Sequence, residues 1–588
     1  MAIRHGLRPP QRLSSKPMPA SPTLPSARPL LLAPRWYPLV ALAAGAISAL
    51  GFAPQEWWPL TVLGVAGLVA LLDVAPTRRS AMLSGWLFGF GQFAVSLTWI
   101  ATAFTFQAKM PPAVGWVAVI GLSMFLALYV ALAAGLARTL GAGGLARVLV
   151  LAACWMLGEW LRGWVLTGFA WNPLGAAWLG APGVAQFAEF IGGLGLSGLM
   201  VLAGGALWLM LRPVASMAGR GAGALLALVL VAVGAIGASR NTETNFFDNP
   251  SLVIIQPNIG QGEKYDPGAE EAHLQRYLDM TRDALGGKPA AGLATGSGED
   301  VLSAPGRSFI TPDEAAITTG VAGIEVGEVA LSEKLAISEE QAPPAIVIWS
   351  ESAVFGLVEE DPALRRRLAS VLGPRDLLMF GGVAANRAAN GEIITLTNSL
   401  FALDSSGKIH GRYDKAHLVP LGEYVPARAL MTRIGLARLA PGDLDFAAGP
   451  GPQTLALPGL PPAGIQICYE IIFGANVIDA AKRPAWIANI SNDAWFGPSG
   501  PPQHLAQARL RAIEEGLPVA RATPTGISAI IDSRGNVLAS QAAGTSGVLR
   551  ATLPPPLPAT RFARLGHGSS AILGVLLLGL GLLVSRRR

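Results

Sequence analysis

The stretch LLALVLVAVGAIGA, residues 225–238, is apolar on every side. A surface helix of a soluble domain keeps a polar face at helical spacing, and this stretch has none. Comparable stretches recur through the first 240 residues, and each membrane-crossing helix needs about 20 mostly apolar residues. Hydrophobic residues make up 51% of the 588-residue chain and charged residues 14%, below the ordinary charged share of about a quarter. The sequence therefore predicts a multi-pass α-helical membrane domain.

Eight transmembrane helices are predicted, seven of them before residue 240. Their expected ranges are 36–53, 57–74, 82–104, 113–137, 145–162, 189–211, 221–239 and 569–585. Residues 1–35 are rich in Pro, Ser and Arg, which predicts a flexible cytosolic tail without a cleavable signal peptide. We therefore expect a seven-helix membrane domain over 36–240, an extramembrane domain over 241–567, and a last helix with a basic cytosolic end over 568–588.

The positive charges predict the orientation of these helices. They gather in the N-terminal tail, in alternate short loops and at the C-terminus, with examples at Arg78, Arg79, Arg138, Arg147, Arg212, Arg220, Arg586, Arg587 and Arg588. The intervening loops hold little more than Lys109 and Arg162. By the positive-inside rule, both termini are cytoplasmic and residues 241–567 lie on the opposite side of the membrane. The net charge of +6 follows from this topology, so no nucleic acid is needed as a partner.

The extramembrane domain has a different pattern. From 250 to 556, short apolar runs alternate with longer helical segments; the runs are LVIIQ, AIVIW, LLMFGG, SLFAL, GIQIC, WIANIS and ISAIID. This alternation predicts an α/β or layered sandwich domain with buried strands. Residues 286–344 are rich in Gly, Ala, Ser and Pro, so we expect a flexible insertion there without a catalytic role.

Cys468, in GIQICYEIIFG (464–474), is one of two cysteines in the chain. The other, Cys154, lies in a predicted span, so Cys468 has no disulfide partner in its own domain. A free cysteine at the end of a core strand is often buried and inert, and this interpretation stays open from the thiol alone. The histidines show no HExxH-like spacing and no metal-ligand cluster is apparent, so we predict no metal and no cofactor.

Glu351 and Lys415 supply the groups that a catalytic thiol needs. Glu351 directly follows the apolar run IVIW, and Lys415 lies in GRYDKAHLVPLGEYVP. A thiol with an ordinary pKa of about 8.5 needs a base for its proton or a cation for its thiolate. A fixed ammonium and the backbone N–H of Tyr469 would also stabilise an oxyanion. Taken alone, each of the two charged residues also fits an exposed surface position.

Four segments resemble a known family. WSESA, YDKAHLVPLGEYVP, GIQICYEIIFG and ISNDAWFGPSGPPQHLAQARLRAIE are similar to the Glu-Lys-Cys nitrilase superfamily and, within it, to the apolipoprotein N-acyltransferases of the bacterial envelope. GFAPQEWWPL and GFAWNPLG in the membrane part agree with this resemblance. It implies an αββα nitrilase-like sandwich on an eight-helix base in the bacterial inner membrane, with the catalytic domain on the periplasmic side.

The resemblance also implies roles for individual residues. It makes Glu351 the general base, Lys415 the stabiliser of charge on oxygen and Cys468 the nucleophile. Support and positioning fall to Glu423, Tyr469 and Glu470. Three features depart from the family's pattern: Tyr265 stands where the family has a tryptophan on a mobile loop at the entrance, the 286–344 segment is longer, and Pro524 with Thr525 replaces a turn that commonly contains Asn.

The implied reaction is a ping-pong acyl transfer. The donor is a membrane phospholipid such as phosphatidylethanolamine, and the acceptor is the α-amino group of the diacylglyceryl-cysteine at the N-terminus of an apolipoprotein. An acyl thioester on Cys468 links the two half-reactions. The expected partners are the phospholipid donor, the diacylated apolipoprotein and the bilayer, whose plane brings the substrates together, and the protein is expected to act as a monomer.

Three other functions remain open at this point. A membrane-anchored nitrilase-type amidase would use water as the acceptor. A Cys-His protease would use His417 or His504. A transporter or receptor would use charged residues within its spans, for which Glu159 and Arg162 are candidates, although i,i+3 pairing at a helix end also explains them. The aromatic residues Trp57, Trp58, Trp164 and Trp171 are expected near the outer interface, as entry-site residues or simple anchors.

Overall fold

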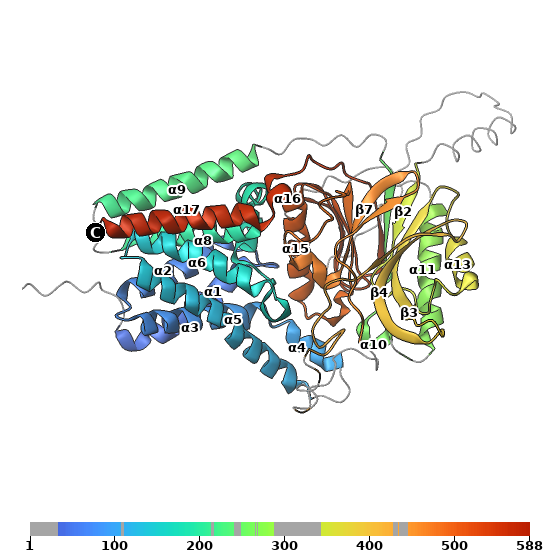
Figure 1. Cartoon of the computed structure of the whole chain (residues 1–588), viewed down its shortest axis with the longest axis horizontal. Coiled ribbons are helices and arrows are strands. Elements are labelled where there is room, and N and C mark those ends of the chain that lie inside the picture. Colours follow the sequence, from blue (N-terminus) through green and yellow to red (C-terminus); the bar gives the residue numbers. More distant parts are fainter. Residues whose placement is uncertain are drawn as a thin grey trace, which may run out of the picture.

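The computed structural model describes residues 33–106, 111–212, 217–239, 249–264, 266, 268–286, 343–426, 428, 433 and 445–587. A bundle of helices and a part built on β-sheets lie next to each other along the longest axis of the molecule (Figure 1). Nearly all of the predicted tail and of the predicted insertion, residues 1–32 and 287–342, lies outside the described residues.

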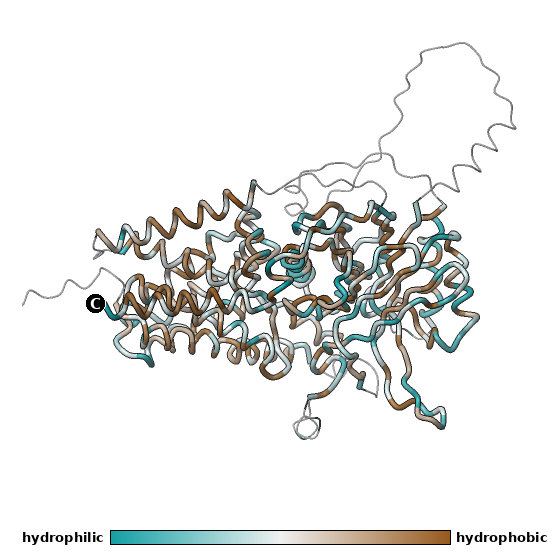
Figure 2. Tube along the Cα trace, turned by 45° about the horizontal axis from the view of Figure 1, so that its top comes forward, coloured by the Kyte–Doolittle hydropathy of each residue, from teal (hydrophilic) through white to brown (hydrophobic). Residues whose placement is uncertain are grey.

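Each predicted span coincides with a helix. The bundle contains α1 (Tyr37–Ser48), α2 (Trp58–Val74), α3 (Arg78–Ser96), α4 (Ile100–Ala103), α5 (Ala113–Leu140), α6 (Leu145–Arg162), α7 (Pro182–Ala185), α8 (Ala188–Leu211), α9 (Met217–Ala238) and α17 (His567–Arg586). Within the described part of the chain, α5, α8, α9 and α17 are long and apolar enough to cross a membrane. These helices are mostly brown in Figure 2. The chain is therefore a membrane protein.

The third predicted span, 82–104, is not one straight helix. It consists of α3 followed by the segment Ile100–Phe106, and the two are bent by 53°. If this bent pair crosses the membrane as one span, the number of candidate spans among the described residues rises from 4 to 5. The remaining predicted spans correspond to α1, α2 and α6, which do not meet the length and hydropathy requirement on their own.

Small residues allow the helices of the bundle to pack closely. A Cβ atom added at Gly45 of α1 would lie 1.9 Å from the carbonyl oxygen of Phe88 in α3. A Cβ added at Gly85 of α3 would lie 2.6 Å from the side chain of Ala134 in α5. Such close approach is typical of membrane helix pairs, which gain their stability from packing instead of from burial out of water.

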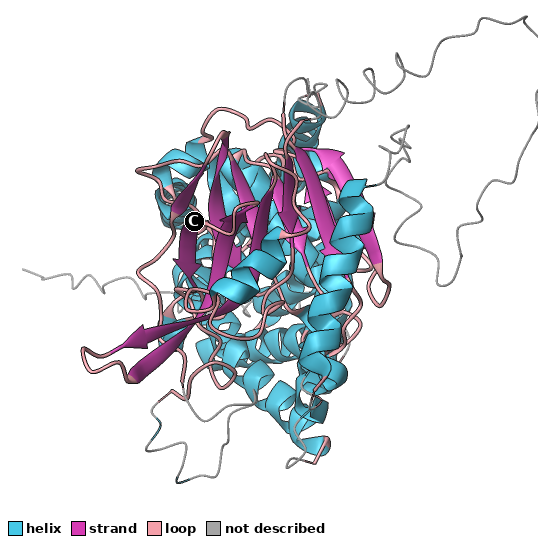
Figure 3. Ribbon diagram, turned by 90° about the vertical axis from the view of Figure 1, so that its right-hand side faces the viewer, coloured by secondary structure: helices cyan, strands magenta, loops and turns pink. Residues whose placement is uncertain are grey.

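Among the described residues, the rest of the molecule is built on two six-stranded sheets with helices beside them. The first has the order β12 (Gly547–Thr552), β1 (Ser251–Gln256), β2 (Ala345–Ile348), β3 (Leu377–Arg387), β4 (Ile393–Asp404) and β5 (Ile409–Asp414). The second has the order β11 (Val537–Gln541), β10 (Ser528–Ile531), β9 (Val519–Ala522), β8 (Trp486–Ile490), β7 (Leu460–Ile467) and β6 (Thr454–Leu457). The three central neighbours β1, β2 and β3 are parallel, and so are β7, β8 and β9. Figure 3 shows the strands from the end away from the bundle.

The apolar cores define the order of the layers. One core cluster combines side chains of the two sheets, among them Ile254 and Ile348 of the first and Ile465 and Ile490 of the second. The opposite side of the first sheet packs on α11 (Ala269–Gly286) and α13 (Pro362–Ala369). The second sheet packs on α15 (Gly500–Glu515) in a cluster that continues into the membrane helices. Helix α15 therefore lies between the second sheet and the bundle (Figure 1).

Candidate active site

The predicted site residues follow the carboxyl ends of strands. Glu351 comes three residues after β2, Lys415 directly follows β5, and Cys468 directly follows β7. Asn492 comes two residues after β8. Because β2 runs parallel to β1 and β3, and β8 runs parallel to β7 and β9, these ends meet at one edge of the two sheets.

Glu351, Lys415 and Glu423 form one buried cluster. The Lys415 Nζ atom lies 3.2 Å from Glu351 Oε1 and 2.9 Å from Glu423 Oε1. Asn398 Nδ2 donates to the same two oxygens, at 2.7 and 2.8 Å. The backbone N–H of Asn492 donates to Glu351 Oε2 at 2.7 Å. One ammonium and one amide thus hold two carboxylates in fixed positions away from water.

Burial and charge act in opposite directions on these groups. Burial disfavours the charged form of Glu351, but Lys415 and the Asn398 amide outweigh it and lower the pKa of the carboxyl group below its ordinary value. Burial also disfavours the Lys415 ammonium, and the Glu351 and Glu423 carboxylates outweigh it and raise the pKa of the lysine. At neutral pH Glu351 is therefore a carboxylate, which can accept a proton, and Lys415 is a cation.

Cys468 lies in a strained turn at the start of the 3-10 helix Cys468–Ile472. Its φ of 51° is in the left-handed region, which costs a residue with a Cβ atom about 1 to 3 kcal/mol. Burial, followed by the Glu351 charge, raises the pKa of the thiol to about 12, and Lys415 counters this only in part. The resting thiol is thus protonated, and ionisation requires a nearby base. The Tyr469 N–H lies in the first turn, where backbone donors have no acceptor within the helix.

Glu470 holds the turn in place. Its Oε1 atom accepts hydrogen bonds from Tyr413 Oη and from the backbone N–H groups of Ala416 and His417, at 2.8, 2.8 and 3.1 Å. Its Oε2 atom accepts from the Ile467 N–H at 2.7 Å. This buried carboxylate therefore connects the segment after Lys415 to the residue before Cys468, as the predicted positioning role requires.

We expect Glu470→Gln to lower the free energy of unfolding by about 3 kcal/mol, because an amide turns a donor toward buried donors that then lack an acceptor. The measurement is the thermal unfolding midpoint of the detergent-solubilised chain. The matched control is Glu392→Gln, since Glu392 is exposed. Equal midpoints for the two variants would contradict the positioning role.

Tyr469 and His417 attach this site to the helical bundle. The Tyr469 hydroxyl donates to the carbonyl oxygen of Gly168 at 3.0 Å, and His417 Nε2 donates to that of Thr167 at 2.9 Å. The His417 ring also stacks on Phe473, with ring centroids 3.8 Å apart. Thr167 and Gly168 belong to the loop after α6, so both the residue next to Cys468 and the segment after Lys415 are hydrogen-bonded to the helical bundle.

Both ring nitrogens of His504 and the Nε2 atom of His417 interact with groups other than the Cys468 thiol. His504 Nε2 donates to the backbone carbonyl of Cys468 at 3.1 Å, and its Nδ1 lies 3.0 Å from both Arg521 and Asp493. His417 Nε2 donates to a loop carbonyl, as described above. His504 therefore supports the turn that contains Cys468, and these contacts give the Cys-His alternative no support.

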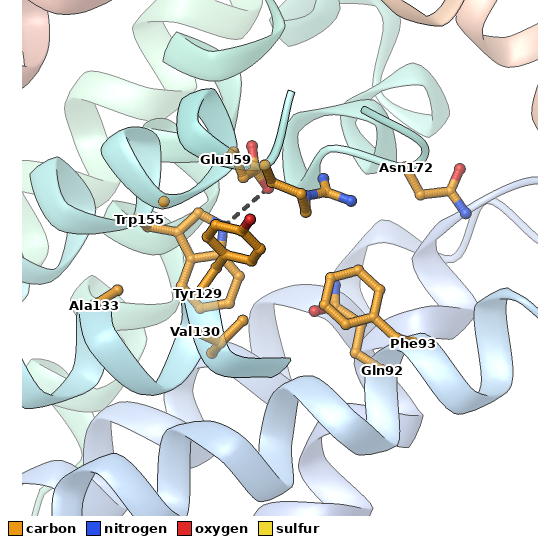
Figure 4. A pocket seen from close by; sticks show the side chains of 10 residues that line it. Gln92, Phe93, Tyr129, Val130, Ala133, Trp155, Glu159 and Asn172 are labelled. Carbon is orange, nitrogen blue, oxygen red and sulfur yellow. Dashed lines mark hydrogen bonds between the residues drawn. The ribbon is translucent and has the colours of Figure 1, made fainter. Parts of the chain in front are cut away.

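Glu159 and Arg162 each have partners of their own. Glu159 Oε1 accepts from Trp155 Nε1 at 3.0 Å, which Figure 4 shows as a dashed line, and from the Leu174 N–H at 2.7 Å. Arg162 Nη1 donates to the carbonyl oxygen of Trp171 at 2.7 Å. Both residues line a pocket among the helices of about 20 Å³, which is room for about one water molecule. Glu159 and Arg162 also line a second, larger cavity, so the size of this pocket does not decide the transporter alternative, and their hydrogen bonds give each residue a structural role.

A larger cavity of about 370 Å³ lies where the bundle meets the sheets. Trp160 and Trp164 line it from the bundle, and His417 and Phe473 line it from the side of the catalytic turn. Trp57 and Trp164 are 57% and 55% exposed, whereas Trp171 is fully buried and its Nε1 donates to Gln503 at 2.8 Å. Trp171 is therefore enclosed by protein at the junction with α15, and its expected position near the outer interface stays a prediction.

Some polar residues of the site were not predicted. Asn398 lies within β4 and bridges two carboxylates, and the Asn492 backbone holds Glu351 from the second sheet. Lys264 lies beneath Glu351, with its Nζ 3.5 Å from the Glu351 carbonyl oxygen. Asn398 and Asn492 are polar residues inside or beside apolar runs, which was their only sequence signal, whereas Lys264 stands in the polar segment QGEKYD. Tyr265 is outside the described residues, so its expected role at the entrance stays a prediction.

Comparison with known proteins identifies the family. The model of the apolipoprotein N-acyltransferase N-terminal domain matches residues 44–206, and the carbon-nitrogen hydrolase model matches residues 329–559. The latter match agrees with the nitrilase-like arrangement of sheets and helices. Among solved structures, an amidase from Nesterenkonia sp. matches with a TM-score of 0.31 and 15% identity, covering 53% of this chain and 93% of that chain.

Relatives match over nearly the whole length. The apolipoprotein N-acyltransferase of Rhodopseudomonas palustris is 35% identical over 558 residues, which cover 93% of this chain and 95% of the relative. That of Bradyrhizobium diazoefficiens is 36% identical over 562 residues, which cover 94% of this chain and 95% of the relative. The chain belongs to the apolipoprotein N-acyltransferase family.

Proposed function

We propose that this enzyme transfers an acyl chain from a membrane phospholipid to the α-amino group of the diacylglyceryl-cysteine at the N-terminus of an apolipoprotein. One observation carries the mechanism: a buried Glu351, Lys415 and Glu423 cluster lies at the same sheet edge as a strained Cys468. A carboxylate that can take a proton, a fixed cation and a thiol are the parts that covalent acyl transfer requires.

In the first half-reaction, the Glu351 carboxylate accepts the proton of the Cys468 thiol, and the thiolate attacks the ester carbonyl of the phospholipid. A C–S bond forms and negative charge develops on the carbonyl oxygen, where the Lys415 ammonium and the Tyr469 N–H stabilise it. The C–O bond then breaks, and protonated Glu351 returns its proton to the departing lysophospholipid oxygen. The enzyme is left as an acyl thioester with an ionised Glu351.

In the second half-reaction, the uncharged α-amino group of the diacylated cysteine attacks the thioester. Glu351 accepts a proton from this amine, the C–N bond forms and the C–S bond breaks. The Cys468 sulfur regains a proton from Glu351, so the enzyme returns to its starting state. The burial of Glu351, Lys415 and Cys468 supports this order, because a site with little water protects a thioester from hydrolysis.

The proposed setting is the bacterial inner membrane. We assign eight spans to α1, α2, the bent α3 and α4 pair, α5, α6, α8, α9 and α17, with an αββα sandwich on the periplasmic side and both termini in the cytoplasm. The alternation of positively charged loops supports this orientation. Phosphatidylethanolamine is the proposed donor and a monomer the proposed active form. The cavity of about 370 Å³ beside Trp160 and Trp164 is the proposed route by which lipid reaches the site.

The covalent step is tested with acyl-labelled phosphatidylethanolamine. We expect the detergent-solubilised enzyme to acquire a label that hydroxylamine removes, since hydroxylamine cleaves thioesters. Addition of a diacylated lipopeptide should move the label to an N-acylated product within one turnover. No label on the protein would overturn the thioester, and release of free fatty acid in place of N-acyl product would favour the amidase alternative.

A further inference from the structure

Lys264 is a second buried lysine at the active site. It ends the short helix α10 (Gln261–Lys264), which follows β1, and only 4% of it is exposed. Its Nζ atom lies 3.5 Å from the carbonyl oxygen of Glu351. Its charge also lies within electrostatic reach of the Glu351 carboxylate and the Cys468 sulfur. No role was predicted for it from the sequence.

The helix that carries Lys264 is attached to the groups that hold Glu351. Gln261 Oε1 accepts a hydrogen bond from Asn492 Nδ2 at 3.1 Å, and the Asn492 N–H donates to Glu351 Oε2 at 2.7 Å. Lys264 and the catalytic carboxylate therefore share one hydrogen-bonded support. A displacement of α10 would change both the cation and the base.

The charges of the site require a second cation. The Glu351 and Glu423 carboxylates share the single Lys415 ammonium, which leaves one negative charge uncompensated in a buried place. Transfer of the thiol proton to Glu351 moves this charge to sulfur but does not remove it. An uncompensated buried charge is strongly unfavourable. With the Lys264 ammonium added, two carboxylates face two ammonium groups, and the sum is zero before and after the transfer.

We propose that Lys264 is a positioning residue that supplies the second positive charge of the active site, balances the Glu351, Lys415 and Glu423 cluster, and thereby stabilises the Cys468 thiolate. The inference rests on the proposed role of Cys468 as nucleophile. In a site that works with a single lysine, the Lys415 ammonium would be sufficient for the thiol to ionise. In this proposal, ionisation of the thiol needs both ammonium groups.

The titration of Lys264 agrees with this assignment. Burial lowers the pKa of the lysine to about 8, although Glu351 and Cys468 raise it in part. Among the described residues, the titratable groups that interact with it are Glu351, Cys468 and His273 of α11. Because the ammonium form exists below the pKa, its contribution to the thiolate is complete well below pH 8 and is lost as the pH rises through about 8.

The test is the rate at which iodoacetamide alkylates Cys468 in the full-length detergent-solubilised enzyme. Mass spectrometry of the peptide that contains Cys468 measures the rate from about pH 6 to pH 10. Compared with wild type, we expect Lys264→Met to slow alkylation at pH 7 by at least about tenfold, which corresponds to a rise of about one unit in the thiol pKa. The control Lys408→Met removes an exposed lysine and should react as wild type does, and Lys264→Arg should restore most of the rate.

A role in charge balance predicts a result that a purely structural role of Lys264 does not. Adding Glu423→Gln to Lys264→Met removes one carboxylate, so the double variant should alkylate faster at pH 7 than Lys264→Met alone. If Lys264→Met is not recovered as folded protein, the double variant with Glu423→Gln tests the proposal instead. Its charges are balanced, so it should be recovered folded. Equal alkylation in Lys264→Met and Lys408→Met, or a double variant that is no better than the single one, overturns the proposal. Failure of wild-type Cys468 to react at any pH would instead count against its role as nucleophile.

Discussion

Cys468→Ala is expected to lower N-acylation of a diacylated lipopeptide by at least about 10⁴-fold, because the thioester cannot form and the remaining groups supply no nucleophile. Folding should be unaffected. Alanine carries a Cβ atom as cysteine does, so the backbone at a φ of 51° is no more strained than before. The measurement combines the rate of product formation with the hydroxylamine-sensitive label on the protein, and both should vanish.

The chain provides its own matched control for this experiment. Cys154 is the other free cysteine, buried in α6, and Cys154→Ala should retain both the label and most of the activity. A hydroxylamine-sensitive label that persists in Cys468→Ala but disappears in Cys154→Ala would move the acyl intermediate to the membrane helix. Activity of Cys468→Ala within tenfold of wild type would exclude covalent catalysis at this residue altogether.

Lys415→Met is expected to lower acyl transfer by about 10³-fold. The substitution leaves the Glu351 and Glu423 carboxylates facing each other through Asn398, without the cation that separates them. Since Lys415 lowers the pKa of Glu351 against burial, together with the Asn398 amide and Lys264, its loss raises that pKa and leaves a smaller share of the base ionised. The residual activity of the variant should therefore increase as the pH rises, until Glu351 again loses its proton.

The measurement for Lys415→Met is the pH profile of the residual rate, compared with Lys408→Met and with wild type. A loss of two buried ion pairs also lowers stability, so the thermal midpoint is recorded in parallel and the rate is measured well below it. A residual rate that does not depend on pH would show that the lysine stabilises the oxyanion alone. A rate within tenfold of wild type would remove Lys415 from the mechanism.

The membrane helices could be predicted from the sequence because apolar composition over a span length is a local property. The break between α3 and α4 could not, since the residues around it continue the apolar run. Contacts from distant segments accompany the bend: Trp99 packs on Trp171 and Phe496, with ring centroids 4.5 and 4.4 Å apart, and its carbonyl oxygen accepts from the Gly497 N–H at 3.2 Å. These contacts form only in the complete fold, so the spacing of apolar residues in the sequence does not reveal them.

Several strands could also be anticipated, but their order could not. β1 pairs with β12 in an antiparallel register that joins Ser251 to Thr552, and a pattern of apolar residues does not specify such a distant partner. The strands β5, β6, β11 and β12 were harder to recognise because they are mixed or partly exposed, as the run of half-buried positions in Val537–Gln541 shows. Their positions depend on pairing with strands that become neighbours only in the folded protein.

For the site, position after a strand was the useful signal. Glu351 and Cys468 each follow an apolar run, whereas Lys415 follows the polar residues GRYD; the structure brings Glu351 and Lys415 into contact and Cys468 to the same edge. Asn398 was missed because it lies inside β4, where an amide has no recognisable pattern. Lys264 was missed because a lysine in a short polar helix normally faces solvent. Only the tertiary fold turns it inward.

The position of α15 has a practical consequence for inhibitor discovery. Gln503 accepts hydrogen bonds from Trp171 and Asn172, Arg509 pairs with Glu56, and Glu514 accepts from the Gly193 N–H, so this helix is docked on the bundle by polar as well as apolar contacts. A fragment that contains the two sheets without the bundle would lack these hydrogen-bond partners. It would also expose the apolar face of α15 to water. Screening and crystallisation campaigns are therefore better served by the intact chain in nanodiscs than by any excised hydrolase core.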